Sequence, residues 1–323
     1  MSSIVITDKN IIYSLYNSHL HNPPFFKKII IQTNNLTHDD LKKIYNMCLL
    51  HGSIHFPNSY HHFFNSSNMI TKKNNFIYTF PKKRIIEFII MGVQKGGTTS
   101  LSLNISKHPN IFMNNNPDPR ISEVHFFDLN WQKGIEWYKK QFNYTYKLVG
   151  DKTPSLLYLP STFPLIQSVN PFVKLLIILR NPVERAFSAC KMNKKNKTEH
   201  RSFEAAILYE LKNLKHINRT FYTISNQYIS RGLYYQQIIE LEKWFPKQNI
   251  LILISEKVKE DMTNQYDQVY QFLNLPSFHA NYQLEHVSNN QKIPNKLYKK
   301  LLDYFKKDIE KLEKHLHIKT NWL

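Results

Sequence analysis

The chain has 323 residues, of which 42% are hydrophobic and only 7 are glycine, so it can bury a sizeable core and is not a low-complexity polymer. Its formal net charge of +19 predicts attraction to polyanions, but charge alone does not choose between nucleic acid, anionic polysaccharide, membrane and phosphorylated ligands. The only cysteines, Cys48 and Cys190, exclude a disulfide framework.

Residues 1–83 are predicted to form an irregular extension before the catalytic domain, with one helical candidate at Thr37–Leu50. The segment begins MSSIVITDKN, without the basic-then-apolar layout of a signal peptide. No run along the whole chain approaches the roughly 18 apolar residues of a membrane helix. These patterns predict a soluble chain without a membrane span and favour the cytoplasm, and they leave the oligomeric state open.

A group of histidines lies in the same segment: His51, His55, His61 and His62. Zinc sites use cysteine or histidine ligands at fixed spacings, which this group lacks. We therefore predict a solvated loop here and no metal site.

From residue 84 onward, short apolar runs alternate with longer amphipathic stretches. The expected strands are Ile85–Val93, Lys147–Gly150, Lys174–Leu179 and Ile250–Ile254. The expected helices are Thr99–Lys107, Gly134–Phe142, Pro182–Met192, Phe203–Leu214, Leu233–Phe245, Asp261–Leu273 and Asn295–His315. This alternation is typical of a parallel sheet covered by helices on both faces. We predict a single α/β domain over residues 84–323, of the kind found in P-loop nucleotide kinases.

The segment IIEFIIMGVQKGGTTSLSL runs from an expected strand through a glycine-containing turn into an expected helix. Such a turn directs backbone N–H groups and the positive end of a helix dipole at an anion. Read as a Walker A loop, it places Thr98 where a kinase has its lysine, and Lys95 comes earlier. The later strand KLLIILR ends in Arg180 instead of a magnesium-binding aspartate. Both features favour a ligand shorter than a triphosphate, held without a metal.

Two motifs carry a family resemblance. GVQKGGTTSL resembles the 5'-phosphosulfate loop of sulfotransferases that use 3'-phosphoadenosine 5'-phosphosulfate (PAPS), and LLIILRNPVERAFSACKM is similar to their 3'-phosphate motif. The resemblance covers roughly residues 84–320 and implies the sulfotransferase fold. It assigns the 5'-phosphosulfate to Lys95, Gly96, Gly97, Thr98, Thr99 and Ser100, and the 3'-phosphate to Arg180 and Ser188, which are eight positions apart.

Between these motifs, RISEVHFFDLNW resembles the acceptor-side segment of the heparan-sulfate branch of the family. Glu123 matches the glutamate of that segment, and a carboxylate can take the proton of an attacking hydroxyl or ammonium group. We expect Glu123 to be the general base. His125 is the second candidate base or an orienting partner. Phe126 and Phe127 are expected to pack in the core, and the role of Asp128 stays open.

GDKTPSLLY is similar to the Lys-Thr/Ser-Pro loop of the family, which implies that Lys152 is a second cation beside Lys95 at the departing group. Lys292 is expected in a shortened version of the loop over the adenosine, because the cysteine pair that closes that loop in heparan-sulfate enzymes does not occur here. We also predict no membrane anchor in this sequence, whereas these enzymes usually carry one.

The sequence thus predicts a PAPS-dependent sulfotransferase that needs no metal. The basic surface and the Glu-x-His-Phe-Phe segment favour an anionic polysaccharide or other glycan as acceptor, without specific nucleic-acid binding. Small molecules, glycolipids and protein tyrosines remain open as acceptors, as does the choice between O- and N-transfer. The alternatives are a P-loop kinase-like phosphotransferase and a non-catalytic polyanion-binding protein.

Overall fold

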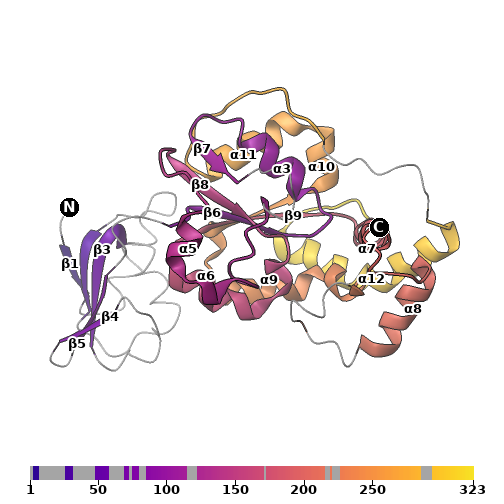
Figure 1. The fold of residues 1–323 in the computed structure, drawn as a ribbon, viewed down its shortest axis with the longest axis horizontal. Helices are drawn as coiled ribbons and strands as arrows, with labels where there is room; N and C mark the ends of the chain where they lie inside the picture. Colours follow the sequence, from indigo (N-terminus) through magenta and orange to yellow (C-terminus); the bar gives the residue numbers. More distant parts are fainter. Residues whose placement is uncertain are drawn as a thin grey trace. The chain divides into compact units, whose positions relative to one another are not determined.

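The structure of the protein, a computed structural model, is drawn in Figure 1. It describes the backbone of residues 3–6, 26–31, 48–57, 69–72 and 75–79, and both backbone and side chains of residues 85–114, 122–170, 172–214, 219, 226–284 and 293–323. The chain divides into two units, Met1–Ile85 and Ile86–Leu323.

The first unit contains a mixed five-stranded sheet in the order β1-β2-β3-β5-β4. Its strands are β1 (Ser3–Ile6), β2 (Phe26–Ile31), β3 (Cys48–Pro57), β4 (Met69–Lys72) and β5 (Asn75–Thr79). β1, β2 and β3 pair in parallel, whereas β5 pairs antiparallel with β3 and β4.

The expectation of an irregular segment is therefore wrong for these stretches. The predicted helix Thr37–Leu50 is wrong at its end, because residues 48–50 belong to β3, and its other residues lie outside the described ranges. Pairing of β3 with strands on both sides overrides the local helical pattern.

The second unit is built on a five-stranded sheet in the order β10-β9-β6-β8-β7, and every pair of neighbouring strands is parallel. The strands are β6 (Phe88–Gly92), β7 (Ile111–Met113), β8 (Leu148–Lys152), β9 (Lys174–Leu179) and β10 (Ile250–Ile254). Central β6 and β9 are almost wholly buried and apolar, as strands covered on both faces must be. The predicted parallel α/β fold is confirmed.

Helices connect the strands and continue beyond them. They are α3 (Thr98–Ile105), α5 (Ile135–Lys139), α6 (Phe163–Val169), α7 (Pro182–Lys195), α8 (Phe203–Asn213), α9 (Tyr234–Glu242), α10 (Ser255–Glu260), α11 (Met262–Phe272) and α12 (Asn295–Leu316). Short 3-10 helices are η2 (Trp131–Lys133), η3 (Leu156–Tyr158), η4 (Pro160–Thr162), η7 (Ser230–Gly232) and η8 (Lys247–Asn249). Across the described part of the chain, no helix combines the length and apolar character that crossing a bilayer requires.

The helices lie on both faces of this sheet (Figure 1). α3, α10 and α11 lie on one face, and α5, α6 and α9 lie on the other. On the first face Leu101 and Ile105 of α3 and Val269 of α11 join a buried cluster with Phe88 and Leu176 of the strands. Burial of apolar surface contributes a free energy of about 25 cal/mol per Å² removed from water. This cluster therefore holds the helices against the sheet.

The position of β6 at the centre of the sheet brings together loops that are far apart in the sequence. β9 and β8 flank β6, and β10 follows β9, so the carboxyl ends of these strands lie along one edge. The chain leaves β6 toward β7 on one side of the sheet and leaves β8 toward β9 on the other. Ligands of open α/β sheets bind in the crevice at such a reversal.

Candidate active site

The turn after β6, residues Val93–Gly97 (the Lys95 turn), fits closely against β9. A Cβ atom on Gly96 would lie 2.3 Å from the carbonyl oxygen of Ile178, so only glycine lets the turn approach this closely. Gly97 caps α3 with a φ of 112°, a left-handed conformation that glycine adopts without strain. The turn is therefore held by backbone contacts that these two glycines permit.

Helix α3 begins directly at the Lys95 turn. Within the described structure its amino end has no side-chain cap and no acidic residue in its first turn. The first N–H groups of a helix have no partner inside the helix and carry partial positive charge. Thr98 and Ser100 are buried at this end of the helix. The N–H groups of the first turn of α3 can therefore act as donors to an anion.

Arg180 follows β9 and reaches the Lys95 turn. Its Nη1 donates to the carbonyl oxygen of Lys95 at 3.4 Å, and its Nη2 lies 3.3 Å from Oε2 of Glu184. The structure thus brings Lys95 and Arg180 together. The sequence assigns Lys95 to the 5'-phosphosulfate and Arg180 to the 3'-phosphate of the same PAPS molecule. Ser188 is buried farther along α7.

A further cation near the turn, Lys191, was missed from the sequence. Lys191 lies on α7 three positions after Ser188, which is one helical turn, and its charge acts on Lys95. Burial lowers the pKa of Lys95, and the positive charges of Arg180 and Lys191 lower it further, whereas Glu123 opposes them. The helical spacing from Ser188 was the only signal in the sequence.

A second group of charged residues, Glu123, His125, Asp128 and Lys152 (the Glu123 cluster), is built from the segment after residue 122 and the end of β8. Oε2 of Glu123 lies 3.4 Å from Nε2 of His125, and Oε1 lies 4.0 Å from Nζ of Lys152. The Glu123 side chain is 26% exposed and that of Lys152 only 4%, so the carboxylate is the accessible member of the pair.

His125 connects two carboxylates. Its Nδ1 donates to Oδ2 of Asp128 at 2.9 Å, and the same oxygen accepts a hydrogen bond from Oγ of Ser155 at 2.6 Å. Burial lowers the pKa of His125, but Asp128 and Glu123 outweigh it and raise the pKa to about 10. His125 is therefore cationic at neutral pH. It also has a φ of 50°, a left-handed conformation that costs a residue with a side chain about 1 to 3 kcal/mol.

Lys152 also contacts a residue outside the Glu123 cluster. Its Nζ donates to Oγ of Ser122 at 3.2 Å, and burial lowers its pKa while Glu123 and Asp151 oppose that shift. Asp151 is itself buried and accepts a hydrogen bond from the hydroxyl of Tyr138 at 2.8 Å. Burial raises the pKa of Asp151 to about 6.

Aromatic packing supports the segment that carries Glu123 and His125. Phe126 is 1% exposed and Phe127 is 2% exposed, as the sequence predicted. The ring of Phe126 stacks on Tyr138 at a centroid distance of 4.2 Å. Phe126 and Tyr138 thus link His125, one residue before Phe126, to Asp151, one residue before Lys152.

The structure brings most of the predicted residues to the same edge of the sheet. The charge of Glu123 acts on Lys95, which links the Glu123 cluster to the Lys95 turn and to Arg180. Lys292 lies outside the described residues. In the ranges with described side chains, no three His, Cys, Asp or Glu residues are placed to hold a metal ion.

These features make the carboxyl edge of the parallel α/β sheet a candidate site for an anionic ligand, with a carboxylate and several cations beside it. The sulfotransferase domain family matches residues 86–315, and the chain belongs to this family. The family resemblance of the sequence motifs is confirmed.

Two curated relatives and one solved structure illustrate the match. The chain is 29% identical over 229 residues to heparan sulfate glucosamine 3-O-sulfotransferase 5 of Mus musculus, which covers 68% of this chain and 61% of that protein. It is 27% identical over 204 residues to bifunctional heparan sulfate N-deacetylase/N-sulfotransferase 1 of Caenorhabditis briggsae, covering 61% of this chain and 23% of that protein. The match therefore spans less than two thirds of the length of either relative.

The crystal structure of a sulfotransferase from Alicyclobacillus acidocaldarius superposes with a TM-score of 0.61 at 24% identity, covering 73% of this chain and 98% of that one. This likeness supports the fold.

Proposed function

We propose that the protein transfers the sulfuryl group of PAPS to a hydroxyl or amino group of an acceptor. The catalytic domain is residues 84–323, and residues 1–83 form an extension outside it. The bound donor would supply a transferable sulfuryl group and a bisphosphate leaving group. The single observation that carries the proposal is the position of Glu123 beside Lys152 and His125, within electrostatic reach of Lys95 in the glycine turn.

The residues around the Lys95 turn fit this donor. Gly96, whose N–H donates to the carbonyl oxygen of Val93 at 2.8 Å, shapes the turn around the 5'-phosphosulfate. The other residues proposed to bind this group, through backbone and hydroxyl donors at the uncapped start of α3, are Gly97, Thr98, Thr99 and Ser100. Arg180, Ser188 and the neighbouring Lys191 offer positive charge and a hydroxyl to the 3'-phosphate. Lys292 is proposed to lie in the loop over the adenosine.

Glu123 is the proposed general base. As the acceptor oxygen or nitrogen forms its bond to sulfur, its proton passes to the Glu123 carboxylate, and the electron pair of the breaking S–O bond goes to the bridging oxygen of the bisphosphate. Lys95 and Lys152 stabilise the negative charge that develops on that oxygen. Both ammonium groups are largely buried, where a fixed charge acts more strongly than in water.

His125 is proposed to orient Glu123 instead of accepting the proton. A histidine whose pKa is raised to about 10 already carries a proton at neutral pH, so it has no free lone pair for the acceptor proton. Its hydrogen bond to Asp128 fixes the ring, and the other ring nitrogen faces Glu123.

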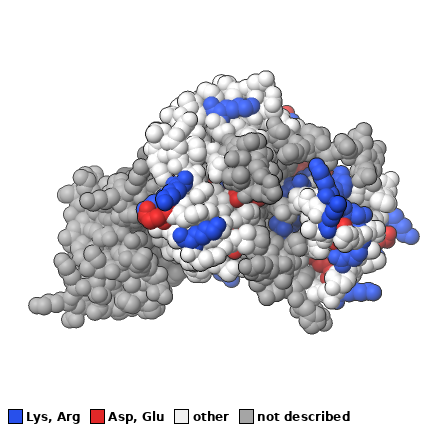
Figure 2. All heavy atoms as spheres, viewed as in Figure 1, with Lys and Arg blue, Asp and Glu red and all other residues white. Residues whose placement is uncertain are grey.

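The proposed acceptor is an anionic glycan. Lys and Arg side chains gather over α7, α8 and α12 on the face of the molecule shown in Figure 2, with fewer acidic side chains among them. Lys191, Lys194 and Lys195 of α7 continue this charge from the proposed 3'-phosphate site. The names of both curated relatives include heparan sulfate, which agrees with an anionic polysaccharide chain.

The direct test is a transfer assay with radiolabelled PAPS across desulfated glycans, phenols and tyrosine peptides. We expect label on a glycan with the wild-type protein and a large loss with Glu123→Gln. Label on phenols or peptides alone would overturn the glycan assignment, and no transfer to any acceptor would favour a non-catalytic polyanion-binding protein.

The rival P-loop kinase predicts a different dependence on metal ions. If Lys95, Lys152 and Arg180 bind the phosphates of the donor, these cations take the place of a metal ion. The rate of sulfuryl transfer should then be the same with and without EDTA. Loss of turnover in EDTA with recovery in magnesium would contradict the sulfotransferase mechanism. ATP binding that requires magnesium would support the kinase.

A further inference from the structure

The turn that follows β9 is held by side chains from several distant elements. The backbone N–H of Asn181 donates to Oε1 of Glu256 on α10 at 3.1 Å. The hydroxyl of Tyr234 on α9 donates to the carbonyl oxygen of Arg180 at 2.8 Å. The side-chain amide of Asn181 also donates, from Nδ2, to the hydroxyl of Tyr298 on α12 at 3.1 Å. The backbone that carries the Arg180 guanidinium is therefore fixed from outside its own strand and helix.

Trp322 contacts two of the three side chains that hold this turn, Glu256 and Tyr234. Its indole Nε1 donates to Oε2 of Glu256 at 3.1 Å. Its ring meets the ring of Tyr234 edge-on at a centroid distance of 6.0 Å. Trp322 is only 5% exposed, so its N–H is shielded from competing water. Each oxygen of Glu256 thus accepts from a different donor, one from the turn and one from Trp322.

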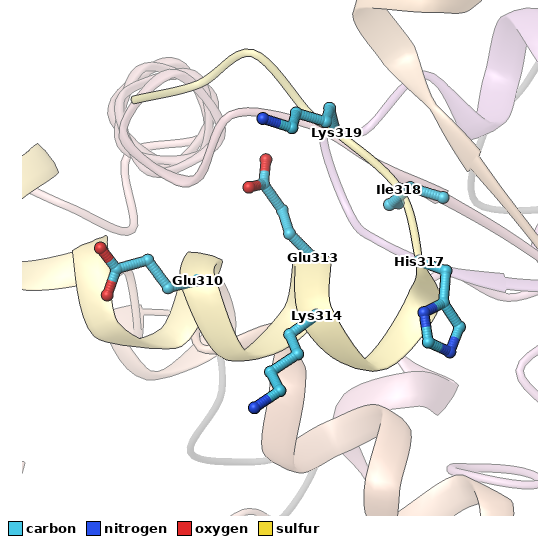
Figure 3. A pocket seen from close by; sticks show the side chains of 6 residues that line it. All are labelled: Glu310, Glu313, Lys314, His317, Ile318 and Lys319. Atoms are coloured by element: carbon cyan, nitrogen blue, oxygen red, sulfur yellow. The ribbon is translucent and has the colours of Figure 1, made fainter.

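The segment after α12 is itself anchored, which places Trp322. His317 ends the helix with a φ of 54°, and the chain then turns back along α12. Oε1 of Glu313 accepts hydrogen bonds from the N–H and the hydroxyl of Thr320 at 2.7 and 2.6 Å. Figure 3 shows Glu313 directed toward this segment, in a pocket lined by Glu310, Glu313, Lys314, His317, Ile318 and Lys319. The pocket mixes acidic and basic side chains.

We propose that Trp322 is a positioning residue that sets the grip of Arg180 on the 3'-phosphate, by way of Glu256 and Tyr234. This inference rests on the proposed function, because it assumes that Arg180 binds that phosphate. Without the indole N–H, Glu256 loses the contact that fixes its carboxylate, and the support of the Asn181 N–H weakens. The Arg180 guanidinium is then less well placed, while the Lys95 turn keeps its own backbone contacts to β9.

The test compares calorimetric affinities for adenosine 3',5'-bisphosphate and for 5'-AMP, which lacks the 3'-phosphate. Trp322→Phe keeps a ring against Tyr234 and removes only the donor. We expect it to weaken bisphosphate binding by about threefold to tenfold, the range for one lost hydrogen bond, and to leave 5'-AMP binding within about twofold. Trp244→Phe, at a tryptophan that is 37% exposed, is the matched control and should change neither.

A second pair of variants separates positioning from loss of structure. Glu256→Gln offers one oxygen to two donors, so it should also weaken bisphosphate binding. In the double variant Glu256→Gln/Trp322→Phe, the single oxygen of Gln is free to accept from the N–H of Asn181. The double variant should therefore bind the bisphosphate no more weakly than either single variant. In an Arg180→Ala background Trp322→Phe should have no further effect on binding. Amide hydrogen exchange at residues 180–184 should become faster in Trp322→Phe.

The outcomes are distinguishable. A wild-type protein that binds both nucleotides equally would overturn the proposed function and this inference with it. A wild-type preference for the bisphosphate that Trp322→Phe leaves unchanged, or that it reduces equally with and without Arg180, would overturn this inference alone. Equal weakening of both nucleotides would assign Trp322 a general structural role and would also overturn it.

Discussion

The Lys95 turn and the Glu123 cluster lie beside each other but are built in opposite ways. The turn is formed by backbone, by two glycines and by Lys95, and Arg180 reaches it from the end of β9. Glu184 pairs with Arg180, and the charge of Glu123 acts on Lys95. In the cluster, negative Asp128 and Glu123 alternate with positive His125 and Lys152 along one line of contacts.

Because of this difference, the two regions should control different properties of the enzyme. The Lys95 turn contains no carboxylate of its own, so its positive charge favours an anionic ligand even though Glu184 and Glu123 lie near it. The cluster largely balances itself, so it holds one carboxylate in position without needing a ligand. Changes in the turn should therefore affect binding of the donor, whereas changes in the cluster should affect the rate of transfer.

The largest expected effect is on the rate, from Glu123→Gln. Removing the base should lower transfer by about 10²- to 10⁴-fold, while affinity for adenosine 3',5'-bisphosphate stays nearly constant. Single-turnover transfer and calorimetry measure the two quantities. Glu136→Gln, at a side chain that is 76% exposed on α5, is the matched control. A near-normal rate in Glu123→Gln with an inactive His125→Ala would move the base assignment to the histidine.

Lys95→Ala should affect both donor binding and the rate of transfer, because Lys95 is proposed to act in both. Its ammonium faces the phosphosulfate before reaction and the bridging oxygen during it, so rate and bisphosphate affinity should both fall. We expect the rate to fall by about 10²- to 10³-fold, as it does when one fixed hydrogen-bond donor at a developing negative charge is removed. Lys247→Ala, at a side chain that is 68% exposed, is the control. A change in rate with unaltered affinity would show that Lys95 acts only in the transition state.

Arg180→Ala should affect binding of one phosphate only. Loss of charge-assisted hydrogen bonds removes about 1.5 to 3 kcal/mol, which is roughly 10- to 100-fold in affinity. The preference for adenosine 3',5'-bisphosphate over 5'-AMP should narrow by this factor, as calorimetry would show. Arg180→Lys should recover part of it, because it restores the charge without the planar fork. An unchanged preference in Arg180→Ala would place the 3'-phosphate elsewhere.

The smallest expected effect is the dependence of stability on pH in the Glu123 cluster. The pKa of His125 is raised from 6.5 to about 10 in the folded protein. Between these values the folded state holds a proton that the unfolded state has lost, so rising pH reduces the stabilisation from His125. The free energy of unfolding should fall by on the order of 1 to 2 kcal/mol across this window after allowance for solvent screening.

Chemical denaturation at several pH values measures this slope. His125→Gln should reduce it, and His279→Gln, at an exposed histidine, should leave it unchanged. An equal slope in the wild type and in His125→Gln would mean that other groups cause it. His125 stays protonated near pH 6.5, so the transfer rate of the wild type should not change there because of His125. The pH dependence of the rate near pH 6.5 should therefore be the same in the wild type and in His125→Gln.

The predicted elements differ in how well the sequence defined them. β9 and β10 have the predicted bounds, because their continuous apolar runs are bounded by polar residues. β7 was missed, since three residues are too few to show a period, and only pairing with β8 makes them a strand. α10 was missed because it begins directly where β10 ends, without a turn signal.

The parallel α/β sheet and the family could be predicted from the sequence, because apolar periodicity and a glycine turn are local properties of the chain. It also proposed Lys95, Arg180, Glu123 and Lys152. How these charges act on one another could be found only from the folded structure. His125 becomes cationic because Asp128 and Glu123 contact both of its ring nitrogens, and Trp322 reaches Glu256 across 66 positions of the chain. A pKa shift and a long-range hydrogen bond depend on distances in space, and neither leaves a periodic pattern in the sequence.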